Sequence, residues 1–316
     1  NTASGYYSLY SNTTGEKNTA SGNYSLHSNT TGNNNTTSGY YSLYSNTTGA
    51  NNVASGFQSL YSNSTGYSNT ASGYQSLYSN TTGYYNTASG FESLEKNTTG
   101  SNNTASGAYS LRYNTTGNSN TASGFESLLY NSEGYSNTAS GYQSLYSNTT
   151  GDDNVAIGYN ALRSNITGIQ NTASGAKSLF SNTSGTNNTA SGMYSLYSNT
   201  TGSDNTAFGY NAQASANNAT NQTMIGYNAT GQADNSVVLG NDDVSAVYMG
   251  EDSGATIYAA GLNIGGTAIT STAAELNLLA GVTSVGSGVL SSVTENSNTG
   301  VRLSTSNASN HGDIGS

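Results

Sequence analysis

An asparagine followed two residues later by serine or threonine recurs at 17-residue spacing through most of the first 204 residues. This Asn-x-Ser/Thr pattern is the acceptor sequence for N-linked glycans. The candidate N-glycosylation sites are Asn12, Asn29, Asn46, Asn63, Asn80, Asn97, Asn114, Asn148, Asn165, Asn182 and Asn199. However, Asn at the first place and Gly at the fourth place of Asn-Thr-Thr-Gly also suit a type I turn. We favour the turn and keep a row of glycans as the alternative.

Tyrosines gather at positions six, seven, ten and sixteen of the 17-residue unit, as in Tyr6, Tyr7, Tyr10 and Tyr84. Flat amphipathic rings repeated along a surface can stack on sugars or on a partner. Rings at one repeat position can also stack on one another and stabilise neighbouring units. We favour these ring ladders, and the two roles are compatible.

Support for catalysis is weak. Glu92 and Glu126 share the seventh position two units apart, roughly 9 to 10 Å if each unit is one layer, which is the upper limit for an inverting glycosidase pair. His27 and His311 are isolated, and Asp152 with Asp153 lacks the glycine-rich pattern of calcium-binding rolls. The sequence therefore predicts a protein that is not an enzyme, with no catalytic, cofactor-binding or metal-binding residue.

The composition excludes several classes of partner. The net charge is −10, with only six Lys and Arg in 316 residues, whereas binding to nucleic-acid phosphates needs clustered basic side chains. No apolar run approaches the ~20 residues of a membrane-spanning helix. We therefore expect no nucleic-acid partner and no direct insertion into a membrane.

The unit itself predicts the fold. Twelve copies of N-T-A-S-G-x-x-S-L-x-x-N-T-T-G-x-x fill residues 1–204, and a thirteenth begins at Asn205. A short fixed period is typical of solenoids, and the second and fourth positions become apolar together, which indicates a strand. We predict an all-β, parallel β-solenoid with one unit per rung and a core column at Leu9, Leu26, Leu43, Leu60, Leu77, Leu94, Leu111, Leu128, Leu145, Leu162, Leu179 and Leu196.

Such a core is thin for a lone chain. Each unit offers one Leu, one Ala and a few hydroxyls against the ordering entropy of its backbone, about 1 to 2 kcal/mol per residue. We therefore expect identical chains to associate, as a homotrimer or a filament.

Later copies carry a sharper motif. It reads NVAIGYNAL at 154–162, IGYNA at 225–229 and NSVVLG at 235–240. These segments resemble the head repeats of trimeric autotransporter adhesins, which also occur in phage tail-fibre-like proteins. The resemblance implies a left-handed parallel β-roll assembled as a trimer. The chain departs from that family's pattern at the fourth position, which is usually Ser where the family favours Ile or Leu.

The chain divides into four parts. Residues 1–240 form the solenoid array, with 17-residue units to 204 and degenerate, shorter rungs to 240. A short β segment is expected over 241–266, with strands at 244–249 and 256–260. A capping box from Thr272 to Glu275 predicts a short helix within 267–282, and 283–316 is expected to be irregular or β. The stretch 274–283 resembles a segment common in phage tail fibres.

These features predict a structural fibre or adhesin rod that lies outside the cell, on a cell or virion surface. It would display a neutral Tyr, Thr and Asn surface for multivalent attachment, with glycans or a cell-surface polysaccharide as candidate partners. The alternative is a self-assembling glycosylated extracellular filament whose repeats form the fibre body.

Overall fold

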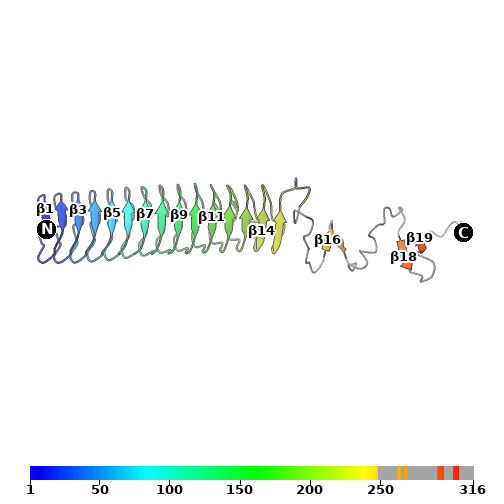
Figure 1. Cartoon of the computed structure of the whole chain (residues 1–316), viewed down its shortest axis with the longest axis horizontal. Coiled ribbons are helices and arrows are strands. Elements are labelled where there is room, and N and C mark those ends of the chain that lie inside the picture. The colour runs from blue at the N-terminus through cyan, green and yellow to red at the C-terminus, as the bar shows by residue number, and fades with distance from the viewer. Residues whose placement is uncertain (248–261, 265–266, 270–289, 295–301, 306–316) are drawn as a thin grey trace. The chain divides into compact units, whose positions relative to one another are not determined.

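The computed structural model describes residues 1–247, 262–264, 267–269, 290–294 and 302–305 (Figure 1). The chain separates into two units, Asn1–Val247 and Tyr248–Ser316. The first unit is a parallel β-solenoid, which confirms the predicted fold class.

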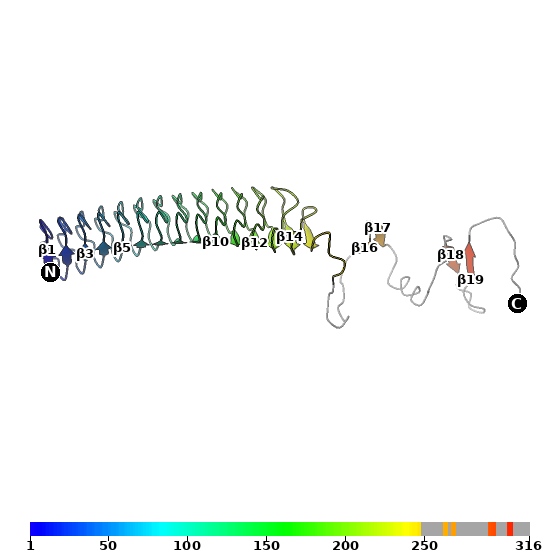
Figure 2. The same ribbon diagram turned by 90° about the horizontal axis from the view of Figure 1, so that it is seen from above.

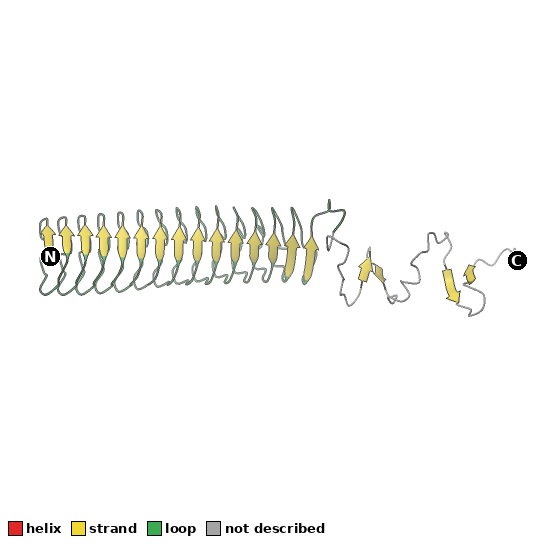
Figure 3. Ribbon diagram, in the orientation of Figure 1, coloured by secondary structure: helices red, strands yellow, loops and turns green. Residues whose placement is uncertain are grey.

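Fifteen strands form one parallel sheet in chain order (Figures 1 and 3). The strands are β1 Thr2–Ser4, β2 Thr19–Ser21, β3 Thr36–Ser38, β4 Val53–Ser55, β5 Thr70–Ser72, β6 Thr87–Ser89, β7 Thr104–Ser106, β8 Thr121–Ser123, β9 Thr138–Ser140, β10 Val155–Ile157, β11 Thr172–Ser174, β12 Thr189–Ser191, β13 Thr206–Phe208, β14 Gln222–Ile225 and β15 Ser236–Leu239. Seen from above, the rungs follow one another in single file (Figure 2).

Every rung keeps the register of the one before it. Thr2 pairs with Thr19 and Ala3 with Ala20, so each residue stacks on its counterpart 17 positions later. The last step is shorter, because Gln222 pairs with Ser236, 14 residues on. The predicted shortening is therefore observed at the step from β14 to β15, whereas β13 and β14 still pair at a spacing of 17 residues. We use "column" for the residues at one repeat position along the array.

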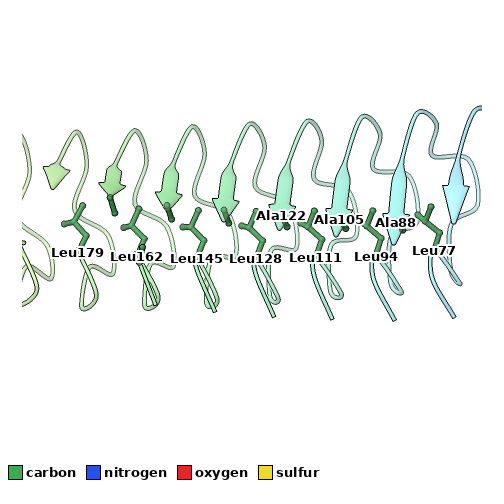
Figure 4. Close-up of a cluster of buried hydrophobic side chains, with 14 of the residues drawn as sticks. Leu77, Ala88, Leu94, Ala105, Leu111, Ala122, Leu128, Leu145, Leu162 and Leu179 are labelled. Atoms are coloured by element: carbon green, nitrogen blue, oxygen red, sulfur yellow. The ribbon is translucent and has the colours of Figure 1, made fainter. Parts of the chain in front are cut away.

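Strand and core follow from the period of two in Thr-Ala-Ser. The alanine is buried and its two neighbours are exposed, as in β5. The leucines predicted for the core face these alanines, and those from Leu26 to Leu196 are fully buried (Figure 4). Leu9 is partly buried because it lies in the first rung, which has a neighbour on one side only within this chain.

The leucine side of the rung contains no strand. Leu77 has a φ of 52°, a left-handed conformation that costs an L-residue roughly 1 to 2 kcal/mol. Its N–H donates to the Ser93 carbonyl of the next rung at 3.0 Å, and its carbonyl accepts from the Asn80 N–H at 3.2 Å. Contacts along and between rungs thus hold a backbone conformation that leucine rarely adopts.

In the second unit, β16 Leu262–Ile264 pairs antiparallel with β17 Thr267–Ile269, and β18 Leu290–Thr294 with β19 Arg302–Thr305. The helix expected within 267–282 is wrong at its start, because Thr267–Ile269 is a strand whose partner immediately precedes it. The remainder of that helix lies outside the described residues. Residues 244–247 are not a strand, and 256–260 lie outside the described residues.

Candidate functional site

The sequon asparagines form a ladder inside the solenoid. Asn80 Nδ2 donates to Asn63 Oδ1 at 2.8 Å and to the Gly83 carbonyl at 3.0 Å. Its Oδ1 accepts from Asn97 Nδ2 at 2.8 Å. From Asn29 onward these side chains are 0 to 2% exposed, whereas Asn12 in the first rung is partly buried. From Asn29 to Asn182, each carboxamide therefore forms hydrogen bonds with its own turn and with both neighbouring rungs.

This ladder supports the turn, which the sequence analysis favoured, rather than the alternative of a row of N-glycans. From Asn29 onward, the nitrogen that would carry the sugar is buried and already donates two hydrogen bonds, so the folded array does not present these asparagines for modification. Asn131 gives an independent check, because Glu133 removes the sequon there. Asn131 nevertheless donates to Asn114 Oδ1 at 2.9 Å and to the Gly134 carbonyl at 2.8 Å. The asparagine serves the ladder whether or not a sequon is present.

A second asparagine ladder runs along the first column, and the sequence analysis missed it. The Asn69 N–H donates to Asn52 Oδ1 at 3.0 Å, and Asn69 Nδ2 donates to the Gly83 carbonyl at 2.8 Å. Gly83 therefore accepts from two side chains of its own rung, Asn69 and Asn80. The available signal was an asparagine at the first position of all thirteen copies. These buried amides supply cohesion that leucine and alanine alone do not.

The outward side chains of the strands form a flat, repeated surface, which we call the strand face. It consists of the second and fourth columns of β1 to β15, mostly Thr and Ser. No charged residue occurs in either column in any of these strands. Toward its end the fourth column becomes apolar at Phe208, Ile225 and Leu239, which are 61%, 43% and 45% exposed.

Aromatic ladders occur where the tyrosines were expected. In the sixth column Phe57 stacks on Tyr74 with ring centroids 5.3 Å apart, and Tyr74 stacks on Phe91 at 4.9 Å. The interplanar angles are 5° and 7°. Ring faces inside such a ladder cover one another, so the edges remain for a partner. Stacking of sugars on open ring faces is confined to the ends and gaps of the ladders.

Of the two glutamates considered for catalysis, Glu92 belongs to a mixed-charge cluster and Glu126 does not. Arg112 contacts Glu92 at 2.7 Å and Glu95 at 2.8 Å, and Lys96 contacts Glu95 at 2.7 Å. Burial alone would raise the pKa of Glu95, but hydrogen bonds from Lys96 and Arg112 outweigh it and lower that pKa below its usual value. Glu126 lies two rungs beyond Glu92 and accepts from Gln143 Nε2 at 2.6 Å. Each glutamate therefore has a partner in a neighbouring rung.

Comparisons with known proteins identify no family. No protein-family model matches the chain, and no curated protein is significantly similar to it in sequence. Among the residues that the structure describes, no helix has the length and apolar character needed to cross a membrane. Within the same residues, no three His, Asp or Glu side chains are grouped as a metal site would require. Function is therefore inferred from the surfaces of the array.

Proposed function

We propose that this protein is an extracellular structural rod that attaches through its strand face to an uncharged surface, as part of a cell-surface adhesin or a virion fibre. The observation that carries the proposal is the strand face itself, which repeats one uncharged Thr and Ser pattern in unbroken register over most of the array. The motif resemblance to adhesin and tail-fibre repeats supports the same class of function.

Repetition is the physical basis of this attachment. One Thr and Ser pair offers a partner two hydroxyl groups, which is too little for stable binding by itself. When many equivalent pairs are held in one rigid line, each contact after the first forms at a high effective concentration. A neutral polysaccharide has hydroxyl groups along its whole length and carries no charge that would require pairing. Such a polymer on a cell surface is the partner class that best suits this face.

Shortening the array tests the proposal. Variants that lack increasing numbers of whole 17-residue units, with the rest of the chain retained, are passed over a film of neutral polysaccharide. Their dissociation rates are measured with a quartz crystal microbalance. We expect the residence time to fall progressively with each unit removed, because avidity depends on the number of contacts. A residence time independent of unit number would contradict multivalent attachment.

A second candidate function, a self-assembling filament, is favoured by the apolar end of the strand face. Phe208, Ile225 and Leu239 are exposed side by side in paired strands, and exposed apolar patches commonly mark association surfaces. Sedimentation of the same length series distinguishes the two functions. A filament sediments without polysaccharide as an assembly whose size grows with protein concentration, whereas an adhesin rod sediments as a single chain or a trimer of fixed size.

A further inference from the structure

One stretch of the array departs from the repeat in two adjacent columns at once. The eleventh column is Ser in nine of twelve complete units, and its exceptions, Lys96, Tyr113 and Tyr130, occupy three consecutive rungs. In the same rungs the tenth column changes from aromatic residues to Glu95, Arg112 and Leu129. Substitutions that accumulate at random would be scattered along the array. Their concentration in adjacent columns of adjacent rungs indicates a local feature.

These substitutions shift the aromatic ladder and open a cavity. The tenth-column ladder continues through Tyr61 and Tyr78, whose rings stack at 5.1 Å. Two rungs beyond Tyr78, a new stack begins in the eleventh column, where Tyr113 and Tyr130 lie 5.2 Å apart with an interplanar angle of 8°. A cavity of about 260 Å³ is lined by this stack together with Tyr109, Arg112, Glu126, Leu129 and Tyr146.

The cavity also contains one hydrogen-bond donor, on Arg112, and one acceptor, on Glu126, that are free to bind a ligand. Arg112 uses Nε and one terminal nitrogen for Glu95 and Glu92, and its other terminal nitrogen has no partner among the described residues. Its guanidinium lies 5.3 Å from the ring centroid of Tyr109 and 5.0 Å from that of Tyr113. Glu126 uses one oxygen for Gln143, and its other oxygen has no partner within the described part of the chain.

We propose that this cavity is a discrete binding site for a single uncharged sugar ring. The free edges of the aromatic rings and the side chain of Leu129 contact the C–H face of a pyranose, while Arg112 donates to one hydroxyl and Glu126 accepts from its neighbour. The volume of about 260 Å³ lies just below the roughly 300 to 1,000 Å³ of pockets for drug-sized ligands, which suits one ring. The site goes beyond the proposed strand-face attachment, because its set of residues in the tenth and eleventh columns occurs at one place in the twelve complete units.

The charged side chains around the cavity indicate which charge the bound sugar should carry. Arg112 and Glu126 are the two charged residues of the lining, and their charges balance, so the cavity has no net charge to pair with an acidic sugar. A cationic ligand is disfavoured as well, because the Arg112 guanidinium already lies over two of the rings that would hold a cation. A neutral hexose at the end of a glycan remains the best match.

The test titrates methyl glucoside, methyl galactoside and methyl mannoside into the full chain and follows ligand saturation-transfer signals and calorimetric stoichiometry. We expect one of the three to bind with one site per chain. Tyr113→Ser, which restores the residue found in most rungs, should weaken binding about tenfold through loss of one aromatic wall. Glu126→Gln keeps the shape of the side chain but replaces its free acceptor by an amide, and should also weaken binding.

The matched control is Tyr67→Ser. Tyr67 stacks on Tyr84 at 5.0 Å in the sixteenth column, where Ser101 and Ser203 occur naturally, and it lies outside the cavity. This variant should bind the sugar like the unmodified chain. Absence of binding to all three glycosides, or full binding by Tyr113→Ser with unchanged circular dichroism, overturns the proposal. Removing the first units of the array should shorten residence on polysaccharide without changing binding of the glycoside, which separates this proposal from the proposed function.

Discussion

Replacing Gly73 by alanine is expected to divide the array into two segments that unfold separately. Gly73 has a φ of 139°, and an added Cβ would lie 2.8 Å from the carbonyl carbon of Gly90 and nearer still to its oxygen. Backbone strain of this kind costs about 1 to 3 kcal/mol, and the clash with the next rung adds to it. Because each rung contacts only its neighbours, one failed interface interrupts cooperativity.

Calorimetry and limited proteolysis measure this outcome. We expect two unfolding transitions in place of one, with cleavage near the junction between β5 and β6. Ser76→Ala in the same rung is the control. It removes a 3.1 Å hydrogen bond to the Gly73 carbonyl, worth about 1 kcal/mol, at a column where Ala161 and Ala212 occur naturally. A single transition at an unchanged temperature for Gly73→Ala would contradict the close rung contact.

Replacing Asn80 by aspartate is expected to destabilise the array by about 3 to 5 kcal/mol at neutral pH, the usual cost of an uncompensated buried charge. The nitrogen that donates to Asn63 Oδ1 and to the Gly83 carbonyl becomes an oxygen, so acceptor faces acceptor. Burial favours the neutral acid and raises its pKa in the folded state. The part of the loss that comes from the charge should be absent below the unfolded pKa of about 3.9 and grow as the pH rises above it. A smaller loss of about 1 to 3 kcal/mol should remain at low pH, because a protonated carboxyl donates one hydrogen bond where the amide donates two.

Urea unfolding at several pH values measures this prediction. Asn102→Asp is the matched control, because Asn102 is exposed in the seventeenth column, where Asp153 and Asp204 occur naturally. The control should leave stability within about 0.5 kcal/mol of the unmodified chain. If Asn80→Asp and Asn102→Asp were equally stable at neutral pH, the claim that the buried asparagine ladder stabilises the array would be wrong.

The solenoid and its leucine column could be predicted from the sequence because both depend on period and residue size alone. Leu at one position and small residues at two others leave few ways to stack the units. The left-handed backbone at Leu77 could not be predicted in this way. Intrinsic preference opposes that conformation in leucine, and only hydrogen bonds to other parts of the stack, which appear once the rungs are assembled, explain it.

The asparagine ladders were hidden for a different reason. A glycosylation sequon, a type I turn and a buried ladder all fit the same Asn-Thr-Thr-Gly pattern, so the sequence alone could not distinguish these three interpretations. Asn131 was the informative position, because it keeps the asparagine where the sequon is lost.

The proposed sugar cavity could not be predicted from the sequence because its lining comes from several rungs. Glu92 and Glu126 were noticed singly, but their neighbours become evident only when the columns are aligned.

Charge placed on the strand face tests the central claim most directly. Ser72, Ser106 and Ser140 lie on that face, and Thr82, Thr116 and Thr150 are equally exposed at a corner of the rung. Two triple lysine variants, one at the three serines and one at the three threonines, carry the same net charge. The residence time on neutral polysaccharide should fall sharply when the three serines are replaced by lysine. It should stay near that of the unmodified chain when the three threonines are replaced by lysine. Equal residence of the two variants would contradict attachment through the strand face.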